Sequence, residues 1–346
     1  MASFNQFGND LHTGKLSYNI VGRRKLWYLI AAVMILIAIV GPILRGGFTL
    51  GIEFTGGSEF VVSQADTQDQ DTASTAIAEV VPAAVPKIST VGADSIRVQT
   101  DQLTETESRE VSAALATAYG VDATQVTSSF IGATWGQDIT AQAVRGLLTF
   151  LVLAGIVMAL YFRTWKMALA AMVALLHDLV ITAGIYGITG FEITPAAVIG
   201  FLTILGYSLY DTVVVFDKIR ENTSIDGPES RRTFAESVNL AVNQTLVRSI
   251  NTSVVAVLPV ASILVIGAFV LGAGTLRDIS LALLIGMLVG TYSTIFIAAP
   301  LYAQLRENEP EILKRDKKSL ALKAKASAGT TDSTVVPSDA ASDVTA

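Results

Sequence analysis

The sequence predicts a membrane α-helical bundle of six transmembrane helices with one external α+β domain of ferredoxin-like topology. Of the 346 residues, 51% are hydrophobic and only 16% are charged, whereas ordinary soluble domains contain roughly 25% charged residues. Six long apolar stretches follow one another along the chain, and a helix needs about 20 apolar residues to cross the roughly 30 Å core of a bilayer. The one long polar segment between them, 46–137, is large enough for a domain.

The first apolar stretch follows a polar segment, 1–25, that ends in three consecutive cations. The run Leu26–Leu44 contains no charged residue over 19 positions. Because a signal-peptide core has only roughly 7–15 apolar residues, we expect a permanent span at 26–45 and no cleaved signal. The other five spans are expected at 138–162, 167–190, 194–216, 248–272 and 277–304.

The distribution of Lys and Arg predicts the orientation of the chain. If the N-terminus is cytoplasmic, 18 of the 24 Lys and Arg residues fall in cytoplasmic segments. Short cytoplasmic loops hold an excess of these residues, and an even number of spans returns the C-terminus to the same side. We therefore expect both termini in the cytoplasm and the segment 46–137 outside.

The external segment has the pattern of short strands alternating with helices. We expect its elements, in chain order, at Glu59–Ser63, Thr67–Val81, Lys87–Val91, Ser95–Thr100, Thr104–Tyr119 and Thr124–Ile131. The resulting order, βαββαβ, is that of the split βαβ motif, in which two helices cover one face of a sheet. Twelve acidic residues against Lys87, Arg97 and Arg109 make nucleic acid an unlikely ligand and favour a surface that contacts proteins.

Two segments on the opposite side are expected to be less regular. In the loop 217–247, apolar residues repeat every four positions from Phe234 to Leu246, which predicts a helix that either lies along the membrane surface or against a partner, or packs on its own bundle. The tail 305–346 begins with a basic patch and continues as a Ser, Thr, Ala and Asp run. We expect this tail to be disordered and solvated, with weak contact to the membrane or the ribosome as the alternative.

Several kinds of chemistry are excluded by composition. The chain has no cysteine and only two histidines, so neither disulfides nor a zinc cluster is expected. Its one Gly-Lys pair, Gly14-Lys15, lacks the rest of a phosphate-binding loop. We therefore predict no cofactor, no metal and no enzymatic activity, and any work must draw on a source other than nucleotide hydrolysis.

Asp211 is the strongest chemical signal. It lies 16 residues after Pro195, about 24 Å along a helix at roughly 1.5 Å per residue, in the cytoplasmic half of the bilayer. A carboxylate there costs at least roughly 2.5 kcal/mol and is therefore paired, neutral or in contact with water. Asp211 is predicted to bind a transported proton. The alternative is a structural hydrogen bond to Ser208 or Thr212.

Two further ionisable residues are candidates for the same chemistry. Arg248, at the cytoplasmic end of the fifth span, could pair with Asp211 and release it as the bundle moves, so that the carboxyl binds and releases a proton. Arg248 could equally extend to the headgroups. Asp178, beside His177 near mid-membrane, is either a second proton site or a structural hydrogen-bonding group.

Four motifs in order resemble the SecF family of bacterial protein-export membrane subunits, from about Leu26 to Tyr302. They are Gly51-Ile52-Glu53-Phe54-Thr55-Gly56-Gly57; Gly206-Tyr207-Ser208 leading to Asp211 and on through Asp217 and Arg220 to Asn222; Asn243-Gln244-Thr245-Leu246 with Arg248; and Gly290-Thr291-Tyr292-Ser293. Two positions depart from the pattern. Glu53 stands where the family usually has Asp, and Tyr210 stands where Asn usually precedes the membrane Asp.

The resemblance implies half of a resistance-nodulation-division transporter in the bacterial cytoplasmic membrane. Such a subunit pairs with SecD, associates with the SecYEG channel and uses the proton gradient to promote preprotein export, with YajC and YidC as further candidate partners. The resemblance assigns proton coupling to Asp211 and Arg248. No nucleic acid is implied.

Three other functions compete with this interpretation. An intramembrane aspartyl protease needs a second aspartate after Gly-x-Gly, but Asp178 follows Leu-Leu-His. An exporter of small molecules or lipids from the same superfamily would usually have two six-span halves in one chain. A passive membrane scaffold would tolerate the loss of Asp211.

Overall fold

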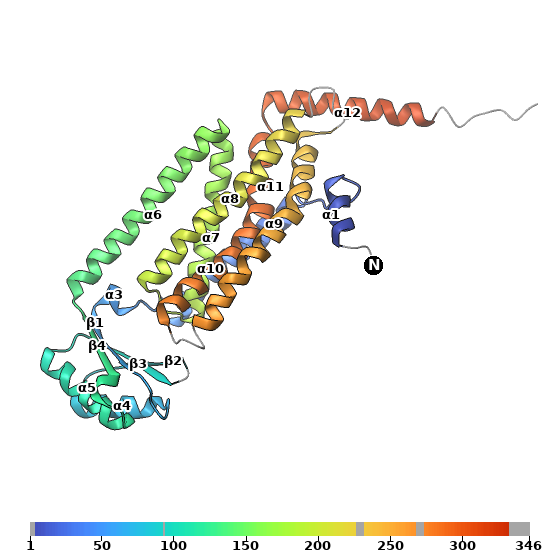
Figure 1. Cartoon of the computed structure of the whole chain (residues 1–346). Coiled ribbons are helices and arrows are strands. Elements are labelled where there is room, and N and C mark those ends of the chain that lie inside the picture. Colours follow the sequence, from blue (N-terminus) through green and yellow to red (C-terminus); the bar gives the residue numbers. More distant parts are fainter. Residues whose placement is uncertain (1–3, 93, 226–231, 268–272, 332–346) are drawn as a thin grey trace, which may run out of the picture.

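The computed structural model describes residues 4–92, 94–225, 232–267 and 273–331. A short helix, α1 (Phe4–His12), precedes a long bundle that carries a small α/β domain at one end (Figure 1). Six helices in the described residues are long and apolar enough to cross a membrane, which confirms the predicted number of spans. They are α2 (Arg24–Arg45), α6 (Ala133–Phe162), α7 (Trp165–Thr189), α8 (Pro195–Ile225), α9 (Phe234–Val265), and a sixth span made of α10 (Gly274–Ser293), the π-helical turn η3 (Thr294–Ala298) and α11 (Ala299–Arg306).

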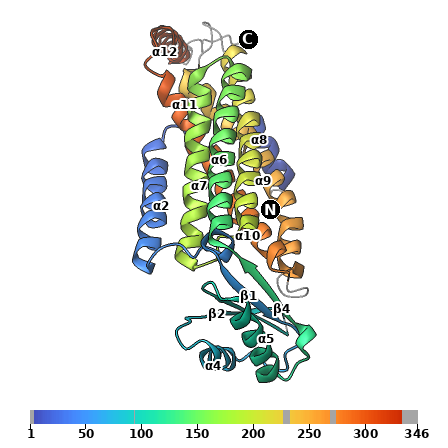
Figure 2. The same ribbon diagram turned by 90° about the vertical axis from the view of Figure 1, so that its left-hand side faces the viewer.

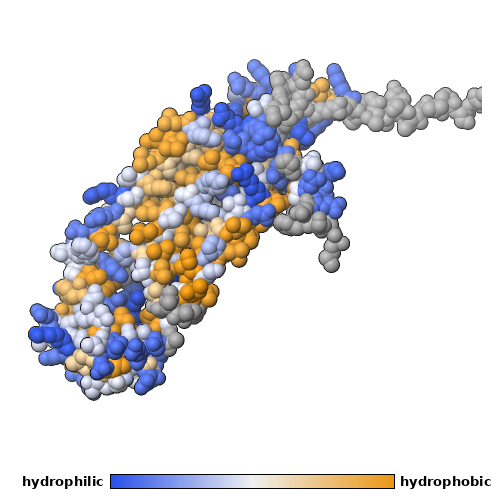
Figure 3. All heavy atoms as spheres, in the orientation of Figure 1, coloured by the Kyte–Doolittle hydropathy of each residue, from blue (hydrophilic) through white to orange (hydrophobic). Residues whose placement is uncertain are grey.

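Small residues allow the central helices of the bundle to pack closely. Gly184 of α7 lies against the backbone of Ala38 in α2, where a Cβ atom would come within 2.7 Å of the Ala38 carbonyl oxygen. Ala170, Ala171 and Ala174 of α7 belong to the largest buried cluster, at the end of the bundle far from the α/β domain. Close approach of this kind is how helices associate in lipid. The outer surface of the bundle is mainly hydrophobic (Figure 3).

The α/β domain has the predicted order of elements, βαββαβ. It consists of β1 (Gly57–Val62), α4 (Gln70–Val80), β2 (Lys87–Val91), β3 (Ser95–Thr100), α5 (Glu105–Tyr119) and β4 (Val126–Ile131), with the short 3-10 helix η1 (Ala123–Gln125) before β4. The strands are all antiparallel in the order β2-β3-β1-β4. Phe60 of β1 pairs with Val98 of β3, and both are buried against Ile77 of α4 and Leu115 of α5. The helices therefore cover one face of the sheet, and the other face is turned toward the bundle (Figures 1 and 2).

Local capping sets the beginnings of the domain's helices. The Thr104 hydroxyl accepts a hydrogen bond from the Glu107 amide while the Glu107 carboxylate accepts one from the Thr104 amide, a complete capping box before α5. The Thr104 hydroxyl and the Thr104 amide both lie within hydrogen-bonding distance of the Glu107 carboxylate and hold its pKa below the usual range. Asp69 caps α4 by accepting a hydrogen bond from the amide of Asp71. Strand β1 begins two residues earlier than expected, and β4 begins two residues later because η1 occupies its predicted start.

The described residues of the segment 217–247 extend the fourth and fifth spans and do not form the separate surface helix that was one of the two alternatives. Helix α8 continues to Ile225, and α9 begins at Phe234 and runs without interruption into the fifth span. Phe234, Val238 and Val242 are buried in the main cluster with Tyr302 of α11. The apolar repeat therefore reflects packing on the chain's own bundle, the second of the two alternatives. Residues 226–231 lie outside the described structure.

The tail also differs from expectation, because residues 310–331 form a helix. This helix, α12 (Pro310–Thr331), crosses the far end of the bundle in Figure 1. The Asp316 carboxylate accepts a hydrogen bond from the Phe234 amide at 2.8 Å, and Lys323 forms an ion pair with Glu236 at 2.6 Å. These contacts anchor a segment that composition alone classed as disordered. The expectation for residues 332–346 lies outside the described residues.

Candidate functional site

Polar side chains from four spans meet inside the bundle. Asp178 of α7 and Asp211 of α8 are both buried, and each accepts a hydrogen bond from a serine of a neighbouring helix. Further hydroxyl groups from α9, α10 and η3 continue this line of polar groups. Buried polar groups in a membrane must find partners within the protein, and this line is the candidate functional site.

Asp178 is fully enclosed by hydrogen-bonding groups. The Ser208 hydroxyl donates to Oδ2 at 2.6 Å, and Nδ1 of His177 lies 3.2 Å from Oδ1. Nε2 of His177 has no hydrogen-bond partner among the described residues, and the His177 ring lies 6.0 Å from that of Tyr292. The prediction that Asp178 makes a structural hydrogen bond and the prediction that it binds a proton both remain compatible with this arrangement.

Asp211 has one bonded and one unbonded oxygen. The Ser249 hydroxyl of α9 donates to Oδ1 at 2.8 Å, whereas Oδ2 is buried and has no hydrogen-bond partner in the described part of the chain. Neither of the partners suggested by the sequence holds this carboxyl. Ser208 is bonded to Asp178, and Thr212 is bonded to Thr294 at 3.0 Å.

Arg248 lies beside the site without contacting the carboxyl directly. It precedes Ser249 on α9, its side chain is exposed, and it makes no ion pair within the described residues. The ion pair with Asp211 that the sequence suggested is therefore not formed in this conformation. Adjacent helix residues point about 100° apart, so Arg248 faces outward while Ser249 faces Asp211.

Two separate groups of hydroxyls link α8 and α9 to the sixth span. The Tyr207 hydroxyl donates to Ser253 at 3.4 Å, and Ser253 lies 2.5 Å from the hydroxyl of Thr291. The partner of Thr212, Thr294, is the first residue of the π-helical turn η3. Turns of this type insert an extra residue and occur often at functional sites. Sequence reasoning missed Ser249 and Ser253, although their spacing of four already placed both hydroxyls on one face of α9.

The first motif, Gly51 to Gly57, forms the junction between span 1 and the sheet. It folds into the short helix α3 (Ile52–Thr55), and the Gly51 amide donates to the carbonyl of Ile193 in the α7–α8 connection at 3.0 Å. A Cβ atom at Gly57 would lie 2.5 Å from the Thr100 carbonyl oxygen, and Gly56 has a φ of 77°. Glycine is therefore required here for the backbone path, and Phe54 packs its backbone against Gly136 of α6.

Three glutamates and one arginine meet at this junction. Arg97 of β3 lies 3.6 Å from the carboxylate of Glu59 and 3.7 Å from that of Glu192. Burial raises the pKa of Glu192, and this effect outweighs the opposing influence of Gln99 and Arg97. Burial likewise raises the pKa of Glu53. A cleft of about 320 Å³ lies between the sheet and the bundle here, lined by residues of both.

The remaining motif residues take structural or exposed positions. Asn243 is buried and binds the backbone of Tyr18 through both ends of its amide, at 2.7 and 2.9 Å. Gln244 accepts a hydrogen bond from Asn222, which joins α8 to α9. The other motif residues of α8 that face outward are Gly206, Asp217 and Arg220.

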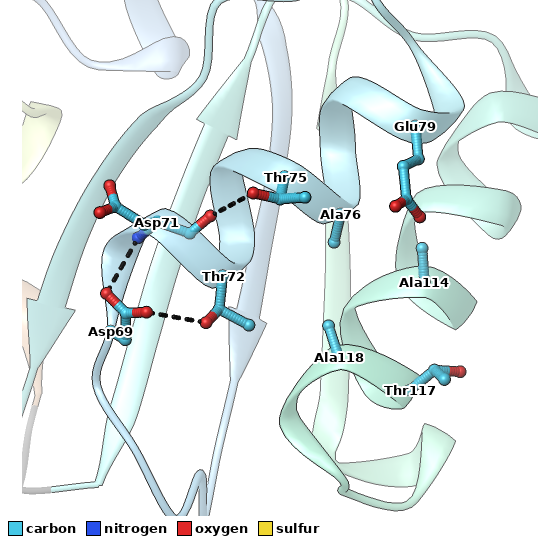
Figure 4. Close-up of a pocket in the computed structure, with 9 residues that line it drawn as sticks. All are labelled: Asp69, Asp71, Thr72, Thr75, Ala76, Glu79, Ala114, Thr117 and Ala118. Atoms are coloured by element: carbon cyan, nitrogen blue, oxygen red, sulfur yellow. Dashed lines mark hydrogen bonds between the residues drawn. The ribbon is translucent and has the colours of Figure 1, made fainter.

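The helical face of the α/β domain carries an open polar groove between α4 and α5 (Figure 4). It measures about 570 Å³, and Asp69, Asp71 and Glu79 give it an acidic wall. The Thr72 hydroxyl donates to Asp69 at 2.9 Å, and Thr75 donates to the Asp71 carbonyl at 2.9 Å. These hydrogen bonds are local to the first turns of α4 and cap the start of that helix.

A six-span bundle with buried, hydroxyl-bonded carboxylates and a single α/β domain at one end defines a multi-pass membrane transport protein. Residues 111–308 match the family model described as protein export membrane protein SecD/SecF, C-terminal. The chain belongs to the SecF family of protein translocase subunits.

Individual relatives agree with this assignment. The chain is 44% identical over 337 residues to the protein translocase subunit SecF of Streptomyces coelicolor, covering 95% of this chain and 87% of the relative. It is 42% identical to the SecF subunit of Mycobacterium tuberculosis, covering 87% and 70%. The crystal structure of SecDF, a translocon-associated membrane protein from Thermus thermophilus, superposes with a TM-score of 0.71 at 28% identity. That comparison covers 85% of this chain but only 39% of the SecDF chain.

Proposed function

We propose that this auxiliary translocase subunit pairs with SecD and uses the proton gradient to promote preprotein export through SecYEG. The fused SecDF chain is more than twice as long as the part that this chain matches, which leaves room there for a second half of the transporter. A separate SecD subunit would supply that half here. In the proposed arrangement the protein lies in the bacterial cytoplasmic membrane with both termini inside, and YajC and YidC are further candidate partners.

The observation that carries the pairing is an exposed polar strip on the spans, which we call the α8–α9 face. It consists of Thr203, Gly206, Tyr210, Arg248 and Asn251, all exposed in the single chain. A Cβ atom at Gly206 would meet nothing within 4 Å. An arginine and an asparagine facing lipid are costly, while small and polar residues are typical of contacts between membrane helices. A partner's helices would remove this strip from lipid.

The same face explains how pairing and proton movement would be linked. Tyr210 and Arg248 on the face immediately precede Asp211 and Ser249, which are hydrogen-bonded to each other just inside it. Movement of a partner helix against the face would shift Arg248 relative to the carboxyl. An approaching cation favours the ionised carboxyl, and its withdrawal favours the protonated form.

The energy available is sufficient for mechanical work. One charge crossing a potential of 100 mV releases roughly 2.3 kcal/mol. A few such steps would reorient the α/β domain, which the chain holds at one end of the bundle (Figure 2). In this scheme the domain contacts the emerging preprotein on the outer side of the membrane.

The test is signal-sequence-dependent export in cells that contain the channel and SecD. Wild type is compared with Asp211→Asn at matched membrane abundance, and Asp138→Asn, the same change at an exposed position of α6 outside the motifs, serves as the control. We expect Asp211→Asn to lower export to the level of a deletion while the variant still co-purifies with SecD, and the control to export normally. Unchanged export with Asp211→Asn would favour the passive scaffold.

A further inference from the structure

Helix α12 starts at the boundary of the bilayer. Arg24, the first residue of α2, forms an ion pair with Glu307 at 2.6 Å, and Lys166, the second residue of α7, forms one with Glu309 at 2.9 Å. Both glutamates lie just before Pro310, where α12 begins. Because Arg24 and Lys166 mark the ends of two spans, the helix leaves the bundle at the level of the lipid headgroups.

Contacts with the bundle fix the rotation of α12 about its own axis. Ile312 and Ser319 are buried, and Arg315 donates hydrogen bonds to the Thr223 carbonyl at 3.1 Å and to the Ser237 hydroxyl at 3.2 Å. Together with the Lys323–Glu236 ion pair, these residues define the docked face of the helix. The helix therefore cannot turn freely, and each remaining side chain has a set direction.

The exposed surface of α12 is divided into an apolar and a cationic part. At about 100° per residue, Leu313 and Leu320 lie roughly 100° and 80° around the axis from Ile312, and they are 45% and 54% exposed. The exposed lysines lie farther around, at roughly 140–240°; they are Lys314, Lys317, Lys318 and Lys325. None of these lysines makes an ion pair within the described residues.

The charge of the helix opposes that of the chain. Residues 310–331 contain six Lys and Arg against two acidic residues, whereas the whole chain has a net charge of −6. Lys residues close to an anionic membrane surface are attracted to it, and the attraction adds up over several residues. Segregated leucines and lysines on a helix that leaves the spans at the bilayer surface are typical of interfacial anchors.

We propose that α12 is an anchor for anionic phospholipid, with Leu313 and Leu320 in the boundary between headgroups and acyl chains and the four exposed lysines on headgroup phosphates. Nucleic acid would satisfy the lysines but would leave both leucines in water, since it is held mainly through phosphate contacts. An anionic bilayer accommodates the leucines and the lysines at once. The surface of the bilayer also lies at the level where α12 begins.

The test uses the full-length protein in nanodiscs of phosphatidylcholine alone or mixed with phosphatidylglycerol. Since the chain has no cysteine, a single Leu320→Cys substitution can carry an environment-sensitive dye. Ala321→Cys, about 180° from Ile312 and on the lysine side, is the matched control. We expect a blue shift at position 320, with quenching by headgroup-level spin-labelled lipid, only in the phosphatidylglycerol nanodiscs, and water-like emission at 321.

Replacing the four lysines by Gln should abolish the difference between the two lipid compositions. If that variant does not fold, rising salt applied to the labelled wild type should remove the same difference, since surface attraction is screened. Equal dye emission at positions 320 and 321 would overturn the proposal. So would a blue shift at position 320 that is the same with neutral and anionic lipid and at low and high salt. A shift that requires added ribosomes or RNA would overturn it in favour of nucleic acid.

Discussion

Removing the positive charge of Arg97 should loosen the α/β domain from the bundle. Arg97 lies 3.7 Å from Glu192 and 3.6 Å from Glu59, and a pair at 3.7 Å attracts by about 4.5 kcal/mol at an effective dielectric constant of 20. Desolvation offsets much of this attraction, because the side chains of Arg97 and Glu192 are only 15% and 13% exposed. Breaking a buried pair costs about 3–5 kcal/mol. Partial exposure lowers our expectation to about 2 kcal/mol, or roughly 30-fold in the equilibrium between docked and undocked domain.

Cross-linking across the cleft measures this equilibrium. Ser89 of β2 and Phe191 of the α7–α8 connection line the cleft from opposite sides, and the absence of native cysteine allows a Cys at each position to be joined by a short bis-maleimide. Arg97→Met keeps the apolar stem and should slow cross-linking in membranes. Arg109→Met, an exposed arginine on α5, should not.

Adding Glu192→Gln to Arg97→Met tests whether the two residues act together. The double variant should recover part of the lost cross-linking, because no unpaired charge is then left at the position of Glu192. If Arg97→Met cross-links within about threefold of the wild-type rate, the ion pair does not hold the domain, and the electrostatic account of the junction is refuted.

Three further outcomes are expected. Burial raises the pKa of Glu53 and Glu192, so the docked domain binds protons more tightly than an undocked one. The rate of cross-linking should therefore increase as pH falls through these raised pKa values. Glu192→Gln should remove most of this pH dependence. Gly184→Ala should destabilise the bundle by about 1–3 kcal/mol in detergent unfolding, because its Cβ overlaps the backbone of Ala38, while a wild-type midpoint would contradict this packing. Thr104→Ala should cost about 1 kcal/mol and speed amide exchange at the start of α5 only.

The elements that could be predicted from the sequence are those whose residue pattern fits only one kind of surroundings, such as a half-buried sheet or a lipid bilayer. Strands β2 and β3 begin and end at the residues expected, since alternation of apolar and polar side chains sets both limits. The six spans followed from length and lack of charge. Asp178 and Asp211 stood out as carboxylates within apolar helices, and both are buried.

The sequence could not decide which surface an amphipathic face contacts. The repeat from Phe234 onward suits a lipid surface and the chain's own bundle equally well, and only the packing against Tyr302 distinguishes them. The partner of Asp211 was missed for a similar reason. Ser208 and Thr212 are its neighbours in sequence, whereas Ser249 reaches it from another helix through the contact of α8 with α9.

The attachment of β4 to α6 has a mechanical consequence. A single residue, Gly132, separates the last residue of β4 from the first of α6, so a movement of this end of the span is passed directly to the edge strand. With 30 residues, α6 is about 45 Å long, and only 6% of its apolar window is buried by other helices. A tilt of about 10° would displace one end by roughly 8 Å relative to the other. A tilt of span 2 would therefore shift the edge strand of the sheet by a similar distance.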